Sequence, residues 1–141
     1  MRAADRQITA LRLLKETFNV LNIAWWAKEY IKETNTFIMY ELNSAYQDKY
    51  LTPNNFTKYD YIGNPDSVVW DTSTCEAFRR NDLICYNNKT KYIFSEQFIV
   101  GGKLHTELFM KKYIFDDYSG REFITGISID AVDVIRDMNK R

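Results

Sequence analysis

The pair Gly101-Gly102 constrains the fold more than any other feature, because it lies between two segments with the composition of β-strands. Residues 91–100 and 103–115 are both rich in β-branched and aromatic side chains. Two consecutive glycines accept the positive φ angles that a tight hairpin turn requires. The sequence therefore predicts an antiparallel hairpin here. A turn over 116–120 and a third strand over 122–130 extend it into a meander.

The N-terminal part carries apolar residues at alternating intervals of three and four, which places them on one stripe of a helix over residues 4–33. Such a stripe is typical of the a/d positions of a coiled coil, so it predicts a homodimer interface. Packing onto a sheet of the same chain is the alternative. The stripe consists of Leu11, Leu14, Phe18, Leu21 and Trp25.

The middle of the chain mixes strand and helix signals. Residues 36–42 predict a strand, and 45–51 predict a second one. Turn-forming residues interrupt 54–82, which favours short helices, with N-capping side chains before a helix over about 72–81. A last helix is expected over 131–140. Helices beside a mainly antiparallel sheet predict an α+β fold.

Charge and cysteine content exclude several classes of protein. The 141 residues include 19 Lys+Arg and 19 Asp+Glu, and the formal net charge of zero argues against direct binding of nucleic acid. No apolar stretch approaches the roughly 18 residues of a membrane span, and the N-terminus lacks the pattern of a signal peptide. Cys75 and Cys85 have no metal-binding spacing, so we expect a reduced, cytoplasmic protein without a metal site.

Three sequence motifs lie in an order that is familiar from a known family. The turn at 116–120 precedes Gly-Ile-Ser-Ile-Asp at 126–130, which resembles the last strand of many PAS domains. YIGNPD at 61–66 and RRND at 79–82 resemble segments of one bacterial sensor subgroup, found in histidine kinases and related regulators. The chain from about 36 to 133 therefore resembles a PAS domain, with an antiparallel sheet and short helices on one face.

The resemblance implies three parts: a dimerisation and signal helix over 1–34, a sensor domain over 35–133, and the start of an output helix over 134–141. It implies a non-catalytic sensory module that senses a small molecule or relays a signal, as a homodimer, to a fused or partner output domain. That output would be a kinase, a cyclic-dinucleotide enzyme or a DNA-binding domain. The alternatives are a ligand-free interaction domain and a small enzyme or carrier of the cystatin-like fold.

By analogy with the family, a ligand would lie between the sheet and the helices. In the last strand Ile124, Gly126 and Ser128 share one face, which the resemblance places toward this space. Ile127 and Ile129 share the other face and need a cover, for which the N-terminal helix is the candidate. The expected lining consists of Phe37, Met39, Trp70, Phe78, Leu108, Met110, Ile124 and Ser128. Plain filling of the core by these residues is the alternative.

The identity of a ligand stays open, but two cofactors are not expected. The string over 75–80 lacks the Asn and Gln of the motif that holds flavin covalently in light sensors, and Ser128 replaces the flavin-facing Gln. The one histidine, His105, falls on a predicted strand rather than in the helical region, where a haem ligand would be expected. No phosphate loop or nucleophile elbow is present, which argues against an enzyme.

Overall fold

The computed structural model describes residues 6–129 of the chain. The strands are β1 (Trp25–Ile31), β2 (Thr36–Leu42), β3 (Lys91–Val100), β4 (Lys103–Asp116) and β5 (Arg121–Ile129). The α-helices are α1 (Arg6–Val20), α2 (Ser44–Tyr46), α3 (Lys58–Tyr61) and α4 (Thr72–Asn88). Between α2 and α4 lie a π-helical turn, η2 (Gln47–Leu51), and two 3₁₀ turns, η3 (Thr52–Asn54) and η4 (Asp66–Val68). Helices and strands thus follow the order helix, two strands, short helices, long helix, three strands.

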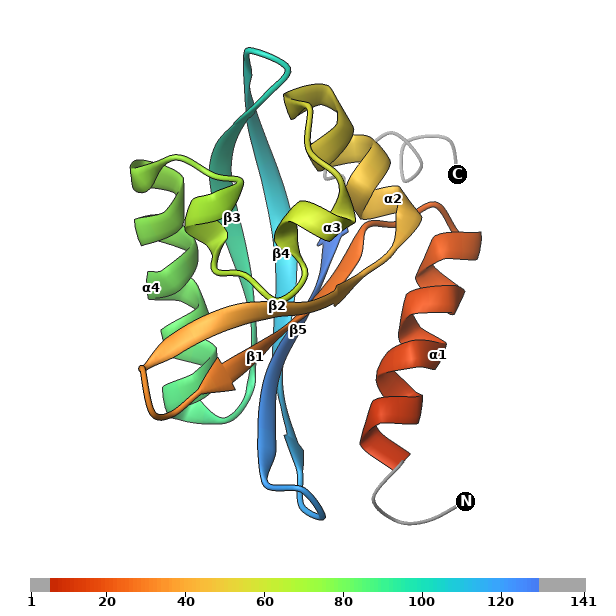
Figure 1. Cartoon of the computed structure of the whole chain (residues 1–141), viewed down its shortest axis with the longest axis vertical. Coiled ribbons are helices and arrows are strands. Elements are labelled where there is room, and N and C mark those ends of the chain that lie inside the picture. Colours follow the sequence, from red (N-terminus) through yellow and green to blue (C-terminus); the bar gives the residue numbers. More distant parts are fainter. Residues whose placement is uncertain (1–5, 130–141) are drawn as a thin grey trace, which may run out of the picture.

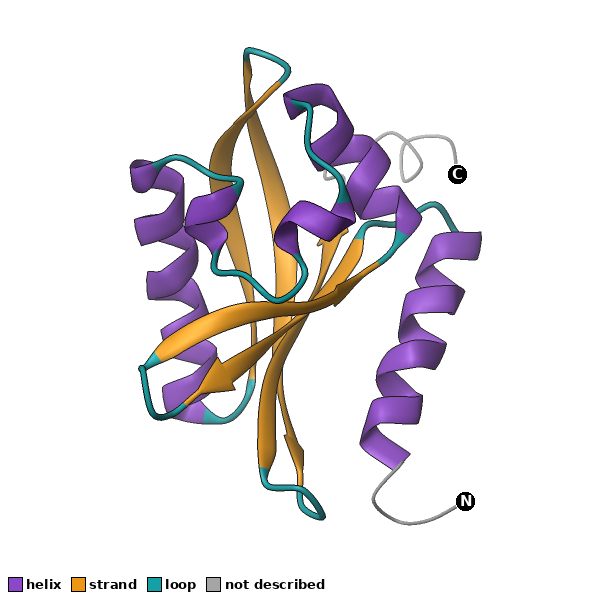
Figure 2. Ribbon diagram, in the orientation of Figure 1, coloured by secondary structure: helices purple, strands orange, loops and turns teal. Residues whose placement is uncertain are grey.

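All strands belong to one antiparallel sheet of 5 strands in the order β2-β1-β5-β4-β3. Figure 1 shows α4 and the short helices on one side of this sheet and α1 on the other. We call the face toward α4 the inner face and the face toward α1 the outer face. Figure 2 shows how the long strands cross the whole molecule between these helices. The α+β class and the antiparallel sheet with short helices are confirmed.

The C-terminal meander also forms as the sequence predicts. Val100 pairs with Lys103 across the turn, where Gly101 and Gly102 have φ angles of 58° and 78°. These angles suit glycine, which has no Cβ to clash with the backbone. The hairpin of β4 and β5 closes where Asp116 pairs with Arg121. Strand β5 lies between β4 and β1, so the meander is joined to the N-terminal hairpin through its last strand.

The predicted helix over 4–33 is wrong beyond Val20, where α1 ends. Asn22 has a left-handed φ of 56°, and the Ile23 amide donates to the Phe18 carbonyl at 2.8 Å. This is the hydrogen-bond pattern of a Schellman motif, which ends a helix. Trp25 therefore begins strand β1 instead of completing a helical stripe. Both faces of β1 are buried near its start, so its sequence lacks the alternation that reveals a strand.

The predicted strand over 45–51 is helical, because Asn43 caps α2. The Asn43 side-chain oxygen accepts the amide of Tyr46 at 2.9 Å and that of Trp25 at 3.0 Å. The helix predicted over 72–81 continues to Asn88, so the motif at 79–82 lies within α4 and not next to a strand. The helix predicted over 131–140 lies outside the described residues.

A glycine allows one large ring to lie flat on the centre of the sheet. Gly126 of β5 pairs with Trp26 of β1. A Cβ atom added to Gly126 would lie 2.4 Å from a carbon of the Trp26 ring, closer than any real contact. Trp26 is itself buried and packs edge-on against Phe109, with ring centroids 5.0 Å apart. The packing of the sheet centre therefore depends on the absence of a side chain at position 126.

Replacing Gly126 with alanine is expected to lower the free energy of unfolding by about 1–3 kcal/mol, because the methyl group overlaps a buried ring. Urea unfolding followed by tryptophan fluorescence measures the change. Ser95→Ala, at an exposed position of β3, is the control and should change stability by less than about 0.5 kcal/mol. If both variants are equally stable, the Trp26 ring is not held as tightly as this contact indicates.

Candidate functional site

Strand register decides which side chains face the space between the sheet and α4, which we call the inner space. Ser128 pairs with Phe109, and both belong to the inner face. Ile124 packs with Cys85 of α4, also on this face. The predicted inward orientation of Ile124, Gly126 and Ser128 agrees with this register. Ile127 packs on the outer face in the cluster around α1, as expected for a residue that this helix covers.

The predicted inward orientation of Leu108 and Met110 is wrong. Met110 lines an outer groove together with Leu14 and Phe18 of α1, and Leu108 shares its side of the strand. The inward residues of β4 are Phe109 and Lys111. Side chains alternate along a strand, so an error of one residue in register moves every side chain to the opposite face. The sequence does not fix this register, because both sets in β4 contain apolar residues.

Aromatic rings fill most of the inner space. Phe98 of β3 stacks on Phe109 at 5.5 Å and meets Trp70 edge-on at 5.5 Å. Phe78 of α4 meets Trp70 at 5.6 Å. Predicted lining residues Met39, Trp70 and Phe78 belong to this cluster, while Phe37 joins Ile124 in a neighbouring one. A cavity beside Phe78 and Phe109 measures about 10 Å³, room for one water at most.

A chain of charged side chains crosses the same space, and we call it the buried charge network. Lys28 of β1 contacts Asp66 at 3.0 Å and Asp82 at 2.9 Å. Lys111 of β4 contacts the second oxygen of Asp82 at 2.9 Å and Glu96 of β3 at 2.9 Å. All five side chains are almost wholly excluded from solvent. One carboxylate of α4, Asp82, thus bridges two lysines that belong to different strands.

Further groups complete the hydrogen bonding of this network. Tyr61 donates to Asp66 at 2.5 Å, and Asn81 donates to Glu96 at 2.7 Å. The Phe78 ring centroid lies 5.1 Å from the Lys28 ammonium nitrogen and 5.2 Å from that of Lys111. Buried charges are tolerated only when they are paired and hydrogen-bonded in this way. The network therefore fixes α4 against β1, β3 and β4.

The electrostatics of the network hold Asp82 and Lys28 in their charged forms. Burial alone would raise the pKa of Asp82, but the attraction of Lys111 and Lys28 outweighs it and lowers that pKa below its ordinary value of 3.8. Burial likewise opposes the charged form of Lys28, yet Asp66 and Asp82 raise its pKa above 10.5. Asp82 and Lys28 therefore stay ionised at neutral pH and act as fixed charges, not as proton donors.

Sequence reasoning missed the network, although one signal was present. Asp82 lies in α4 at helical spacing between two buried apolar residues, Phe78 and Cys85. An acidic residue on the apolar face of a helix indicates a buried partner of opposite charge. The partners themselves, Lys28 and Lys111, lie in strands far apart in the sequence, and nothing local connects them to α4.

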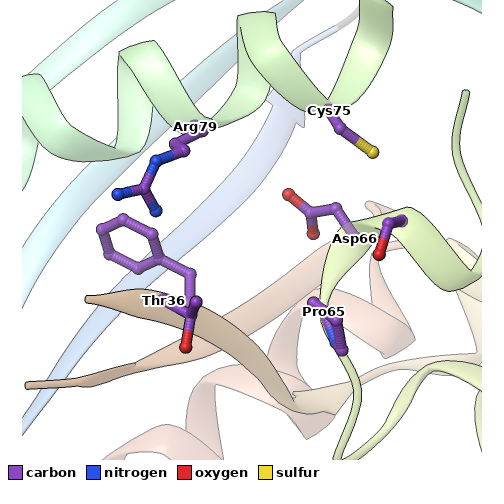
Figure 3. A pocket seen from close by; sticks show the side chains of 7 residues that line it. Thr36, Pro65, Asp66, Cys75 and Arg79 are labelled. Carbon is purple, nitrogen blue, oxygen red and sulfur yellow. The ribbon is translucent and has the colours of Figure 1, made fainter. Parts of the chain in front are cut away.

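A small open cleft of about 160 Å³ adjoins the network between β2, η4 and α4. Figure 3 shows the side chains of Asp66 and Cys75 near one another in this cleft, with the Arg79 guanidinium further along α4. Burial raises the pKa of the Cys75 thiol to about 11, so the thiol is protonated and a poor nucleophile at neutral pH. The cleft is lined by Thr36, Phe37, Pro65, Asp66, Ser67, Cys75 and Arg79.

The described part of the chain lacks a metal-binding cluster and a membrane-spanning helix. Within residues 6–129, no group of three or more His, Cys, Asp or Glu side chains is placed to hold a metal ion. No helix in the same range is both long and apolar enough to cross a membrane.

The sequence matches no family model and no curated protein sequence. The fold resembles the PAS domain of Bordetella pertussis BvgS, with a TM-score of 0.64 and 14% identity over 94% of this chain and 96% of that one. A PAS domain from Colwellia psychrerythraea has a TM-score of 0.61 and 15% identity, over 86% of this chain and 96% of that one. The light-state dimer of the fungal blue-light photoreceptor Vivid has a TM-score of 0.51 and 9% identity, over 77% of this chain and 78% of that one. The chain therefore has the PAS fold.

Replacing Asp82 with asparagine is expected to lower the free energy of unfolding by about 3–5 kcal/mol, since it leaves two buried lysines with one carboxylate fewer. Urea unfolding measures the loss. Asp117→Asn, at an exposed position in the β4–β5 turn, is the matched control and should be nearly neutral. A loss no larger than that of the control would mean that the network contributes little to stability.

The pH dependence of the free energy of unfolding should reveal the ionisation of the Asp82 carboxylate. Because the folded pKa of Asp82 lies below its ordinary 3.8, its stabilisation is present above that pH and is lost as pH falls below it. We expect wild-type stability to fall more steeply than that of Asp82→Asn as the pH falls from about 4 to about 2. Urea midpoints at a series of pH values test this. Parallel profiles would contradict the low pKa of Asp82.

Proposed function

We propose that this PAS-fold chain is a regulatory signalling domain that relays a signal through its packed interior, without a large cofactor. The filled inner space carries this proposal. The cavity beside Phe78 and Phe109, of about 10 Å³, is far smaller than the roughly 300–1,000 Å³ of typical ligand sites. Rings and the buried charge network instead connect the sheet to α4. A rigid, fully packed interior can transmit a displacement at one surface to another.

The solved neighbours support a role in signalling. They include a PAS domain of BvgS and a fungal blue-light photoreceptor. Their sequence identity to this chain is low, so the similarity supports a common fold but not a common ligand. Flavin or haem would have to displace several buried rings, so neither belongs to this proposal. We propose no catalysis, since the thiols of Cys75 and Cys85 both have pKa values raised by burial to about 11. The free cysteines also support the cytoplasmic location.

A small-molecule sensor is the second candidate, and the cleft between β2, η4 and α4 supports it. At about 160 Å³ it can hold only a small ligand. Asp66 belongs to both the cleft and the buried charge network. A ligand that disturbs Asp66 would therefore change its contact with Lys28 and reach α4 through Asp82.

Homodimerisation through α1 is part of the proposal, but the proposed contacts differ from the helical stripe that the sequence predicts. Of the predicted interface, Leu11 and Trp25 are buried in the chain's own core, and Leu14 and Phe18 pack beside them. Leu21 is 60% exposed and remains available to a second copy. Leu13 and Val20, which the helical stripe did not include, are also exposed at 58% and 86%. The predicted output helix over 134–141 lies outside the described residues and stays a prediction.

Native mass spectrometry of the protein purified from cells tests this function. We expect a dimer of bare polypeptide, and a monomer for the double variant Leu13→Glu/Leu21→Glu, since each charge would be buried without a partner in the interface. Tyr59→Glu places the same charge at an 80% exposed position of α3 and should remain a dimer.

Three other outcomes are distinct. Extra mass of a flavin or a haem would overturn the proposal of a filled interior. A small bound molecule that Arg79→Gln removes would favour the second candidate, the sensor at the open cleft. A dimer that survives the double variant would show that α1 is not the interface.

A further inference from the structure

An ammonium group lies against two aromatic rings where α4 ends. The Nζ atom of Lys89 is 3.4 Å from the centroid of the Tyr86 ring and 4.5 Å from that of the Tyr113 ring. The two centroids are 6.0 Å apart and the ring planes meet at 67°, so the rings form a corner around the cation. The Glu122 carboxylate of β5 lies 3.3 Å from the same nitrogen. We call Tyr86, Tyr113 and Glu122 together the cation cage.

The walls of the cation cage are held in place by contacts that do not involve Lys89. Tyr30 of β1 stacks on Tyr86, with ring centroids 4.1 Å apart. The hydroxyls of Tyr113 and Tyr86 donate to the two oxygens of Glu122, at 2.5 Å and 3.4 Å. Burial opposes the charged form of Glu122, but these hydrogen bonds and Lys89 lower its pKa below the ordinary 4.5. The cage is therefore preorganised and keeps its negative charge at neutral pH.

The cation that fills the cage belongs to a side chain that can leave it. Lys89 has a side chain that is 47% exposed, so the cage is open to solvent along the lysine stem. Its backbone has a left-handed φ of 52°, a conformation in which glycine commonly ends a helix. The backbone thus disfavours a lysine at this position, and the contacts of its ammonium group with the cage favour it.

The chemistry of the cage suits one class of cation in particular. Aromatic faces and a carboxylate around a single cation are the arrangement that recognises quaternary ammonium groups. A primary ammonium group is strongly hydrated, so leaving the cage for water costs Lys89 little. A trimethylammonium group has no N–H to donate to water, and its methyl groups gain from contact with the rings. Such a group can therefore compete with the lysine.

We propose that the cation cage binds a small molecule with a quaternary ammonium group, which takes the place of the Lys89 ammonium group. Its methyl groups lie on the ring faces of Tyr86 and Tyr113, and Glu122 balances its charge. No residue of the cage lines the open cleft or belongs to α1. The site therefore stands or falls separately from the relay function and the dimer proposed above.

Choline is the probe, and its neutral control is the alcohol in which a carbon atom replaces the choline nitrogen. Titration of the full chain is followed by the ring proton signals of Tyr86 and Tyr113 in NMR spectra. Lys89→Gly empties the cage and suits the left-handed backbone, so we expect it to fold and to bind choline with a Kd of about 1 mM. The wild type should bind about tenfold more weakly, because Lys89 leaves the cage only part of the time.

Two further variants, each made in the Lys89→Gly chain, test the walls of the cage. Tyr113→Leu removes a ring face and Glu122→Gln removes the charge, and each should weaken choline binding by about tenfold or more. Glu122→Gln is nearly isosteric, so it keeps the test valid if Tyr113→Leu does not fold. Tyr118→Leu removes a 67% exposed tyrosine from the turn before β5 and is the matched control, which should bind choline unchanged.

Four results would overturn the proposal. Choline fails to bind Lys89→Gly, the neutral alcohol binds it equally well, or the variants of the cage walls keep the affinity for choline. The fourth is a wild-type chain that does not respond to choline, since the lysine would then not exchange with a ligand.

Discussion

The buried charge network is the constraint on which the rest of the structure depends. Asp82 bridges lysines of β1 and β4, and Glu96 extends the contacts to β3, so one helix is fixed against three strands. Charges without solvent are costly unless their partners lie in the right geometry, and a helix shifted by one turn would lose those partners. Rings alone could repack in several ways. The network selects one position of α4 and with it the shape of the interior.

That constraint explains why a fold known for holding ligands is filled here. Lysines and carboxylates take up the middle of the inner space, and Trp26, Phe78 and Phe109 lie beside them. Because Gly126 has no side chain, the Trp26 ring packs directly against the backbone of the sheet. Fold and function are separable for this reason: the same sheet and helices can enclose a cavity or a packed core, and side chains decide which.

The sequence predicts what depends on neighbours along the chain and misses what depends on contacts across it. Gly101-Gly102 specifies its hairpin because the turn itself requires glycine. Strand β1 escapes prediction because it is central, and Trp25 and Trp26 are both buried on opposite faces. The inward side of β4 could not be read because Leu108 and Phe109 are equally apolar. The partners of Asp82 come from strands that only the folded sheet brings together.

Strand β1 joins the cluster under α1 to the packed interior. Successive side chains of a strand point to opposite faces, so Trp25 packs in the cluster under α1 while Trp26 enters the packed interior. Two residues on, Lys28 is bound to Asp66 and Asp82. A displacement of α1 that moves Trp25 would act on the strand that also carries these contacts. Because β1 pairs with β5 in the middle of the sheet, it cannot shift by itself. Any change at α1 must then reach α4 through the sheet, which makes the packed core a means of coupling the two faces.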